Sequence, residues 1–478
     1  MMFCILPLLL MFGCAGTTTF TAYPTKINPY IASIQTRTPI DFTQCLISEC
    51  ESKDLILYNM ERGRIAQLTG DLDNSQKDFR ASIEQIKLND EKAHITASGI
   101  GSNFAAAAVN DNAIPYVGSG YERVMLHHYQ AMNYIKKQDL DGAGVEVRVA
   151  NAEQEAALKQ FEGDLEKAQK DAEEKNVNSD SNSKISSQYA QMDEVAGKVK
   201  NSFQNAYTFY LSGFIYELNK QYNDAYIDYK KALEIYPENT YLQKDVLRLA
   251  DTLDMREDIS ALSERFNISP IKISSGSGEL LVIYEDGFAP QKQEVKIPIP
   301  VPRVGLLAIA FPIYKESWTR QVPLNVSDNT TQIGITEPIC DFRALAVKAL
   351  KEQIPVIAVR QVVRAAAKGA ASLGAKKVAD QLGVGFLGTL TASIYNYASE
   401  NADLRSWLTL PSNAQILRTQ LQPGMHKIAL TSPVSAGPFY VDVEISAGGK
   451  TILHVVRAGS QFYMSSTPFK LQALSAQL

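Results

Sequence analysis

Residues 206–237 carry the clearest pattern of apolar and polar positions in the chain, and it predicts two amphipathic helices joined by a short turn. Small residues stand where the two helices would touch, at Gly213, Ala225 and Ala232. Proline cannot continue a helix, so we expect Pro237 to end the second one. Bulky aromatic residues would fill the space between the helices and towards a neighbouring hairpin: Phe209, Tyr216, Tyr222 and Tyr229.

The same places of the hairpin pattern are filled again in residues 55–86 and 121–150. Gly63 and Ala131 take corresponding places and lie 68 positions apart (131 − 63), which is two units of about 34 residues. This period and the small and aromatic positions match the tetratricopeptide template of stacked helical hairpins. Generic amphipathic hairpins are the alternative. We therefore expect an α-helical, tetratricopeptide-like repeat domain over residues 43–266.

Other stretches of this domain depart from the hairpin pattern. Residues 95–120 are rich in Gly, Ala and Asn, which is typical either of a loop that contacts a partner or ligand, or of an irregular insert that only packs. Residues 152–175 predict a charged helix, followed by a mobile polar linker near residues 176–185. We expect another helix at residues 186–202, and further helices at residues 239–266 that cap the stack.

The second half predicts a smaller α+β domain over residues 270–478. Residues 279–302 indicate a strand, a turn at Asp286-Gly287 and a second strand with alternating prolines, which must lie at a sheet edge or leave the sheet. A hairpin at residues 446–451 would join the last two strands. The remaining predicted strands follow the same alternation: residues 304–314, 389–397, 416–421, 425–430, 439–446 and 451–457.

A helical stretch rich in small residues occupies residues 341–395 between these strands. Small residues at four-residue spacing also occur where helices associate in lipid, but charges such as Arg360, Arg364 and Asp380 leave no uncharged run of spanning length. Residues 383–388 read GVGFLG, which fits a dinucleotide-binding fingerprint without its preceding strand.

The chain begins with an apolar run, residues 3–12, that has the length of a signal-peptide core. We expect residues 1–13 to be a signal peptide and residues 14–42 to be an extended tether. The sequence from Met11 to Ala15 resembles a bacterial lipobox, which would make Cys14 the acylated, palmitate-bearing residue. An ordinary cleaved signal peptide is the alternative. By resemblance to sorted lipoproteins, Ala15 after the cysteine indicates the outer membrane.

Composition excludes some classes of function. A net charge of −5 with 21% charged residues gives no basic surface for nucleic acid. The sequence lacks the metal-binding spacings of Cys and His, so we expect no metal and no cofactor. It also lacks the usual catalytic motifs, so nothing in it names an enzyme activity, and a non-catalytic role is favoured without excluding an enzyme. Cys45 and Cys50 would form either a small disulfide or two free thiols.

The order of parts resembles the tetratricopeptide lipoproteins of Gram-negative envelopes. The resemblance rests on Cys14, on residues 118–151 (GSGYERVMLHHYQAMNYIKKQDLDGAGVEVRVAN) and on residues 403–411 (DLRSWLTLP). It implies a periplasmic protein anchored in the outer membrane and no established activity.

Two functions remain open at this stage. One is a scaffold that binds envelope proteins through the repeat groove and the membrane through its lipid, with peptidoglycan as a further partner. The other is an enzyme or small-ligand binder with a pocket between the domains, near residues 95–120 or 403–411. Repeat hairpins expose their first helices inside the stack, so the candidate partner-binding residues are Tyr210, Phe214, Glu217, His127, Gln130 and Asn133.

Overall fold

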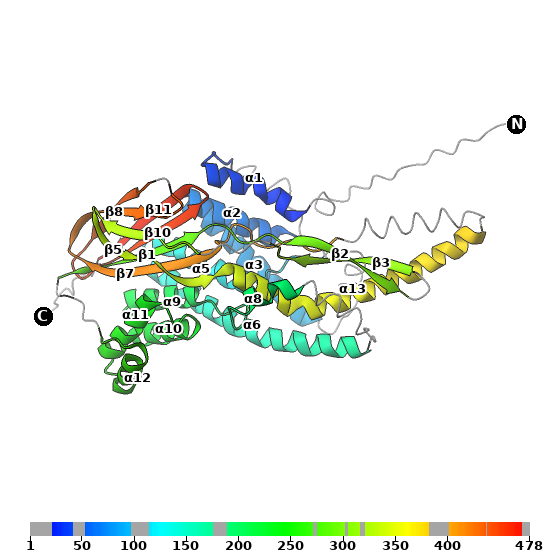
Figure 1. Ribbon diagram of the computed structural model, residues 1–478, viewed down its shortest axis with the longest axis horizontal. Helices are drawn as coiled ribbons and strands as arrows, with labels where there is room; N and C mark the ends of the chain where they lie inside the picture. The colour runs from blue at the N-terminus through cyan, green and yellow to red at the C-terminus, as the bar shows by residue number, and fades with distance from the viewer. Residues whose placement is uncertain are drawn as a thin grey trace.

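The computed structural model describes residues 22–41, 53–96, 114–174, 189–270, 274, 276–301, 305–315, 321–381, 401–435 and 437–470. The first half of this part is helical, and the second half combines strands with one long helix (Figure 1). Several predictions fall outside the described residues: the signal peptide, Cys14, Cys45, Cys50, the linker at residues 176–185, the strand at residues 389–397, the GVGFLG motif and most of the glycine-rich stretch, residues 97–113.

All three predicted helical hairpins are present. The second helix of each packs on the first helix of the next, so the hairpins form a stack. A fourth helix pair follows, in agreement with the helices expected at residues 239–266. The hairpins are α2 (Leu55–Thr69) with α3 (Leu72–Thr96), α5 (Gly120–Lys136) with α6 (Leu140–Glu174), α9 (Ala206–Leu218) with α10 (Tyr222–Ile235), and α11 (Thr240–Thr252) with α12 (Arg256–Phe266).

Glycines let the two helices of a hairpin approach closely. A Cβ atom added at Gly63 would lie 2.6 Å from the ring of Phe79, and one at Gly213 would lie 2.7 Å from the ring of Tyr229. Contacts this short cannot form, so only glycine fits at these places. Tyr222 is 38% exposed and does not fill the internal space as expected, because it is the first residue of its helix.

A helix near the N-terminus corrects the prediction of an extended tether. Helix α1 (Tyr23–Thr36) buries Tyr23, Ile27, Ile31 and Ile34 and contacts strand β11. These positions follow a helical spacing that the prolines obscured. Pro24 lies in the first turn of the helix, where no hydrogen-bond donor is missed, whereas Pro29 lies inside the helix.

Within the described residues, the strands form three sheets. The first has five strands in the order β11-β10-β1-β7-β6, in which only the β1–β10 pair is parallel. The second has four antiparallel strands in the order β5-β4-β8-β9, and the third pairs β2 with β3. Their bounds are β1 Gly278–Asp286, β2 Gln293–Val301, β3 Gly305–Ile313, β4 Asn325–Asp328, β5 Thr331–Ile335, β6 Glu337–Asp341, β7 Asn413–Leu421, β8 Gly424–Thr431, β9 Phe439–Ile445, β10 Lys450–Ala458 and β11 Gln461–Phe469.

Strand β1 lies at the centre of three layers, and all nine of its residues are buried. Leu281 and Ile283 belong to the core shared with the helices. Leu280 and Val282 belong to a second core, formed with the four-stranded sheet. The five-stranded sheet is therefore covered by helices on one face and by the other sheet on the opposite face.

Two strand connections differ from the sequence-based prediction. The turn at residues 446–451 joins β9 to β10, which lie in different sheets and do not pair. The turn at Asp286-Gly287 is present, and β1 and β2 likewise belong to different sheets. The prolines of β2, Pro298 and Pro300, lie in a two-stranded sheet in which each strand is an edge, as expected.

A long arm projects from the body. Helix α13 (Phe342–Gln381) packs on β3 and α6, and these elements extend together to the right of Figure 1. The helix expected at residues 186–202 is replaced, within the described residues, by a 3-10 turn (Ala190–Met192) and the short α8 (Asp193–Ala196). Among the described residues, no helix has the length and apolar character needed to cross a bilayer.

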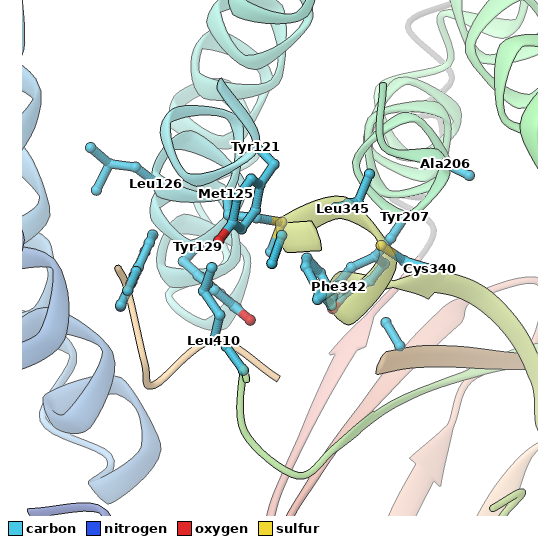
Figure 2. Close-up of a cluster of buried hydrophobic side chains, with 14 of the residues drawn as sticks. Tyr121, Met125, Leu126, Tyr129, Ala206, Tyr207, Cys340, Phe342, Leu345 and Leu410 are labelled. Atoms are coloured by element: carbon cyan, nitrogen blue, oxygen red, sulfur yellow. The ribbon is translucent and has the colours of Figure 1, made fainter. Parts of the chain in front are cut away.

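The helical half and the strand half share one core. Figure 2 shows Tyr129 of α5 and Tyr207 of α9 converging with Phe342 of α13 and with Leu410, which precedes β7. All four side chains are buried in one cluster. The first helices of the hairpins therefore face the strand half of the same chain.

Candidate functional site

The residues proposed on α9 do not line an open groove. Tyr210, Phe214 and Glu217 are all buried. The Tyr210 hydroxyl donates a hydrogen bond to Asp245 Oδ2 at 2.8 Å, and the Arg418 guanidinium lies 5.1 Å from the centre of the Phe214 ring. These contacts join α9 to α11 and to strand β7, so the inner face of this hairpin is filled by the chain itself.

The residues proposed on α5 are also buried. His127 Nδ1 lies 2.7 Å from Glu146 Oε2 on α6. Gln130 and Asn133 donate to α3, to the carbonyl of Gln76 at 3.3 Å and to the hydroxyl of Ser75 at 2.8 Å. The expectation that these side chains face an exposed concave surface is wrong, because they bind the helices on either side.

The segment at residues 403–410 lies along α2 and α5 and is held by buried carboxylates. Glu61 accepts hydrogen bonds from the backbone amides of Leu408, at 2.6 Å, and Thr409, at 3.0 Å. Glu122 accepts from the amide of Trp407 at 2.7 Å. Each carboxylate thus satisfies backbone donors that would otherwise be buried without partners.

Trp407 fills the space between two hairpins. Its side chain is fully buried, and its ring centre lies 5.9 Å from that of Phe79 on α3 and 5.8 Å from that of Tyr129 on α5. The DLRSWLTLP segment therefore occupies the inner surface that the sequence assigned to a partner.

Burial raises the pKa of Glu61 from 4.5 to about 7, although hydrogen bonds from Thr409, Leu408 and Tyr23 favour the ionised form. The pKa of the Glu61 carboxyl group therefore lies in the neutral range. Its oxygens are occupied by backbone amides and by the Tyr23 hydroxyl, at 3.1 Å. This geometry fits a structural role and leaves no oxygen aimed at a substrate.

A buried ion network joins the third hairpin to the sheet. Glu217 lies 3.1 Å from Arg418, 2.9 Å from Arg248 and 2.8 Å from Lys450. Arg418 also lies 3.0 Å from Glu279 on β1. Burial alone would raise the pKa of Glu279, but the nearby Arg418 and Lys450 lower it to about 2. Both glutamates are ionised at pH 7 and bind β1, β7 and β10 to α9.

A second ion pair lies at the other end of β1. Arg64 on α2 binds Glu285, and both side chains are buried. The Tyr207 hydroxyl donates to Glu285 Oε1 at 2.8 Å, and His454 Nε2 lies 3.4 Å from the same oxygen. Burial opposes ionisation of Glu285, but Arg64 and His454 outweigh it and hold its pKa below the usual range.

The two histidines next to this pair are neutral at pH 7. Burial lowers the pKa of His454 to about 4 and that of His128 to about 3. His128 is buried against the rings of Tyr129 and Tyr207, and His454 is buried beside Glu285. A buried neutral histidine is a poor acid or base near pH 7, so neither ring is suited to proton transfer there.

A cavity of about 270 Å³ opens beside His454. It lies between the C-terminal ends of α2 and α5 on one side and β10 and β11 on the other. Lys136, the last residue of α5, lines it together with the hydroxyl-bearing residues of β11. This is not the position expected for a pocket, near residues 95–120 or 403–411.

Metal binding has no support in the part of the chain that the structure describes, since no group of three or more His, Cys, Asp or Glu side chains there is arranged to hold a metal ion. Cys340 is a buried thiol, and burial raises its pKa well above its ordinary value, so it is not an activated nucleophile.

Sequence reasoning missed most of the residues that join the two halves. Glu61, Arg64 and Glu122 resemble ordinary charged positions on amphipathic helices. A signal existed for Glu279 and Glu285, because β1 reads GELLVIYED without a polar face. When a strand is buried on both faces, charged residues near its ends must be paired, because an unpaired buried charge is costly.

Comparisons with known proteins assign the chain to no group: no family model matches it, and no curated protein or solved structure matches it.

Proposed function

We propose that this chain is a periplasmic lipoprotein, anchored in the outer membrane through Cys14, that acts as a non-catalytic scaffold for envelope proteins. The stack of helical hairpins supports a scaffold, since such stacks present long surfaces to partners. The buried ionisable groups at the interface of the two halves are used in structural pairs, which supports the non-catalytic part.

The location of the partner surface differs from the one first expected. The inner face of the hairpins is filled by the strand half, so the partner surface is assigned to the outer helices. Val145 and Val149 on α6 are 51% and 38% exposed, and Ile227 on α10 is 50% exposed. Asn151 of α6 donates to Asp228 of α10 at 2.8 Å, so a hydrogen bond links these two outer helices.

The observation that carries this assignment is the exposure of these apolar side chains on the outer helices. Residues four apart share one face of a helix, so Val145 and Val149 present their side chains together. Apolar side chains that are exposed on a monomer are typical of contact surfaces when they gather on one face.

Cross-linking with mass spectrometry in intact cells tests the proposal. Wild-type protein is expected to give cross-links from α6 and α10 to envelope proteins, and the pair Val145→Asp and Val149→Asp is expected to lose them while keeping its melting temperature. Met425→Asp, at a 69% exposed position on β8, is the matched control and should retain them. Cross-links that persist in the α6 variant, or that come only from other surfaces, would contradict the proposal.

A further inference from the structure

The cavity beside His454 joins the two halves of the chain. Gln67 and Gly70 at the end of α2 and Lys136 at the end of α5 form one wall, and His454, Ser465 and Thr467 form the other. A volume of about 270 Å³ is just below the range for ligand pockets, roughly 300 to 1,000 Å³. Such a cavity accommodates a small metabolite or the end group of a larger molecule.

The charges near the cavity do not balance. Arg64 and Glu285 neutralise each other in their buried pair, and His454 is neutral at pH 7. Lys136 remains, and within the described residues its ammonium group has no hydrogen-bond or ion-pair partner. The cavity therefore carries one positive charge in excess.

The same environment acts on the protonation of Lys136. Burial and the nearby Arg64 lower its pKa to about 8, against the opposing effect of Glu285. At pH 7 the amine is still mostly protonated. A bound anion would supply the missing counter-charge and raise this pKa.

Hydroxyl groups face the lysine across the cavity. The pairing of β10 with β11 places Ser465 opposite His454 and Thr467 opposite Ile452, so both hydroxyl-bearing residues lie on the face that carries His454. Neither hydroxyl has a hydrogen-bond partner in the described part of the chain. His454 itself is 3% exposed, and its Nε2 lies 3.4 Å from Glu285 Oε1 without forming a hydrogen bond.

Lys136 also belongs to the last turn of α5, where a cation is favourable because helix C-termini carry partial negative charge. That role explains a lysine at this place. It does not explain two hydroxyl groups without partners on the opposite wall, which an oxyanion would satisfy by accepting their hydrogen bonds.

We propose that this cavity binds a small ligand through one carboxylate or phosphate group, with Lys136 as its counter-ion and Ser465 and Thr467 as hydrogen-bond donors. The inference is independent of the outer-helix surface, and a failure of either leaves the other in place.

Residue-specific amine labelling of the full chain tests the site without any substitution. A brief reaction with an N-hydroxysuccinimide ester is run in sodium phosphate, sodium acetate or sodium chloride of equal ionic strength. Fragment spectra then quantify the modification of Lys136 and of Lys137. Lys137 is the internal control, because it is exposed and already binds Asp73 and Gln76.

We expect phosphate or acetate to reduce the labelling of Lys136 several-fold relative to chloride and to leave Lys137 unchanged. Protection in the phosphate arm alone identifies a phosphate site, and protection in the acetate arm alone identifies a carboxylate site. Equal labelling of Lys136 in all three salts would overturn the proposal. In the double variant Ser465→Ala and Thr467→Val, protection should weaken; undiminished protection would remove the two hydroxyls from the site.

Discussion

Arg64 on the first described hairpin and Glu285 on the central strand form an ion pair in which both side chains are buried. The pair spans 221 positions of sequence and joins the helical half to the strand half. The Arg64 guanidinium also lies 4.0 Å from the centre of the Tyr129 ring, so it touches two hairpins and the sheet at once.

Removing one member of this pair should destabilise the whole molecule. Arg64→Met leaves the Glu285 charge buried without its counter-ion, which typically costs about 3 to 5 kcal/mol. Urea unfolding measures the loss. The double variant Arg64→Met and Glu285→Gln should recover part of it, because no charge is left unpaired. Arg256→Met breaks an exposed pair with Asp254 and should change nothing measurable.

The raised pKa of Glu61 gives stability a specific dependence on pH. A carboxyl group with a pKa of about 7 in the folded state and 4.5 otherwise binds a proton more readily when folded. Its contribution to the free energy of unfolding therefore decreases as the pH rises from about 4.5 to 7. We expect the stability of wild type relative to Glu61→Gln to fall across this window, as measured by urea unfolding at several pH values.

The buried histidines change the stability with pH in the opposite direction to Glu61. His454 and His128 have lowered pKa values in the folded protein, about 4 and about 3, so the unfolded chain binds protons more readily below pH 6.5. Their joint effect is a loss of stability as the pH falls from about 6.5 towards 4. His454→Asn should reduce this loss. An unchanged pH profile in that variant would contradict the assignment.

Gly63 should tolerate no side chain. The Cβ of Gly63→Ala would lie 2.6 Å from the Phe79 ring, and overpacking of this kind costs about 1 to 3 kcal/mol. Gly163→Ala on α6 is the matched control, because no atom of the described part of the chain lies within 4 Å of its Cβ position. Alanine favours helices over glycine by up to about 1 kcal/mol, so the control should be neutral or stabilised in thermal unfolding.

Fatty-acid attachment at Cys14 is tested by metabolic labelling. Cells grown with a clickable palmitate analogue should label the wild-type protein, and Cys14→Ser should abolish the label while the protein is still exported. A label that survives the substitution would show that another residue carries it, and equal absence from both proteins would favour an ordinary signal peptide.

Local patterns in the sequence were enough to predict the hairpins. The helices of α9 and α10 are neighbours in the chain, and the close approach of Gly213 to Tyr229 has a short-range signature. The strand order has no such short-range signature in the sequence, because β1 pairs with strands more than 120 positions away. The same limit applies to the site: Glu61 binds the amide of Leu408, and nothing near Glu61 in the sequence indicates that partner.

The position of β1 has a consequence for the order in which the chain acquires its structure. Both neighbours of β1, namely β7 and β10, follow it late in the sequence, and Glu279 pairs with Lys450, 171 positions further on (450 − 279). Contacts between such distant positions form slowly, because a long loop must close first. During synthesis the N-terminal part of the chain is made first. The helical hairpins are therefore complete while their inner face is still uncovered. Truncation before β10 should yield an aggregating product in place of a soluble helical fragment, and the last strands should set the rate of folding.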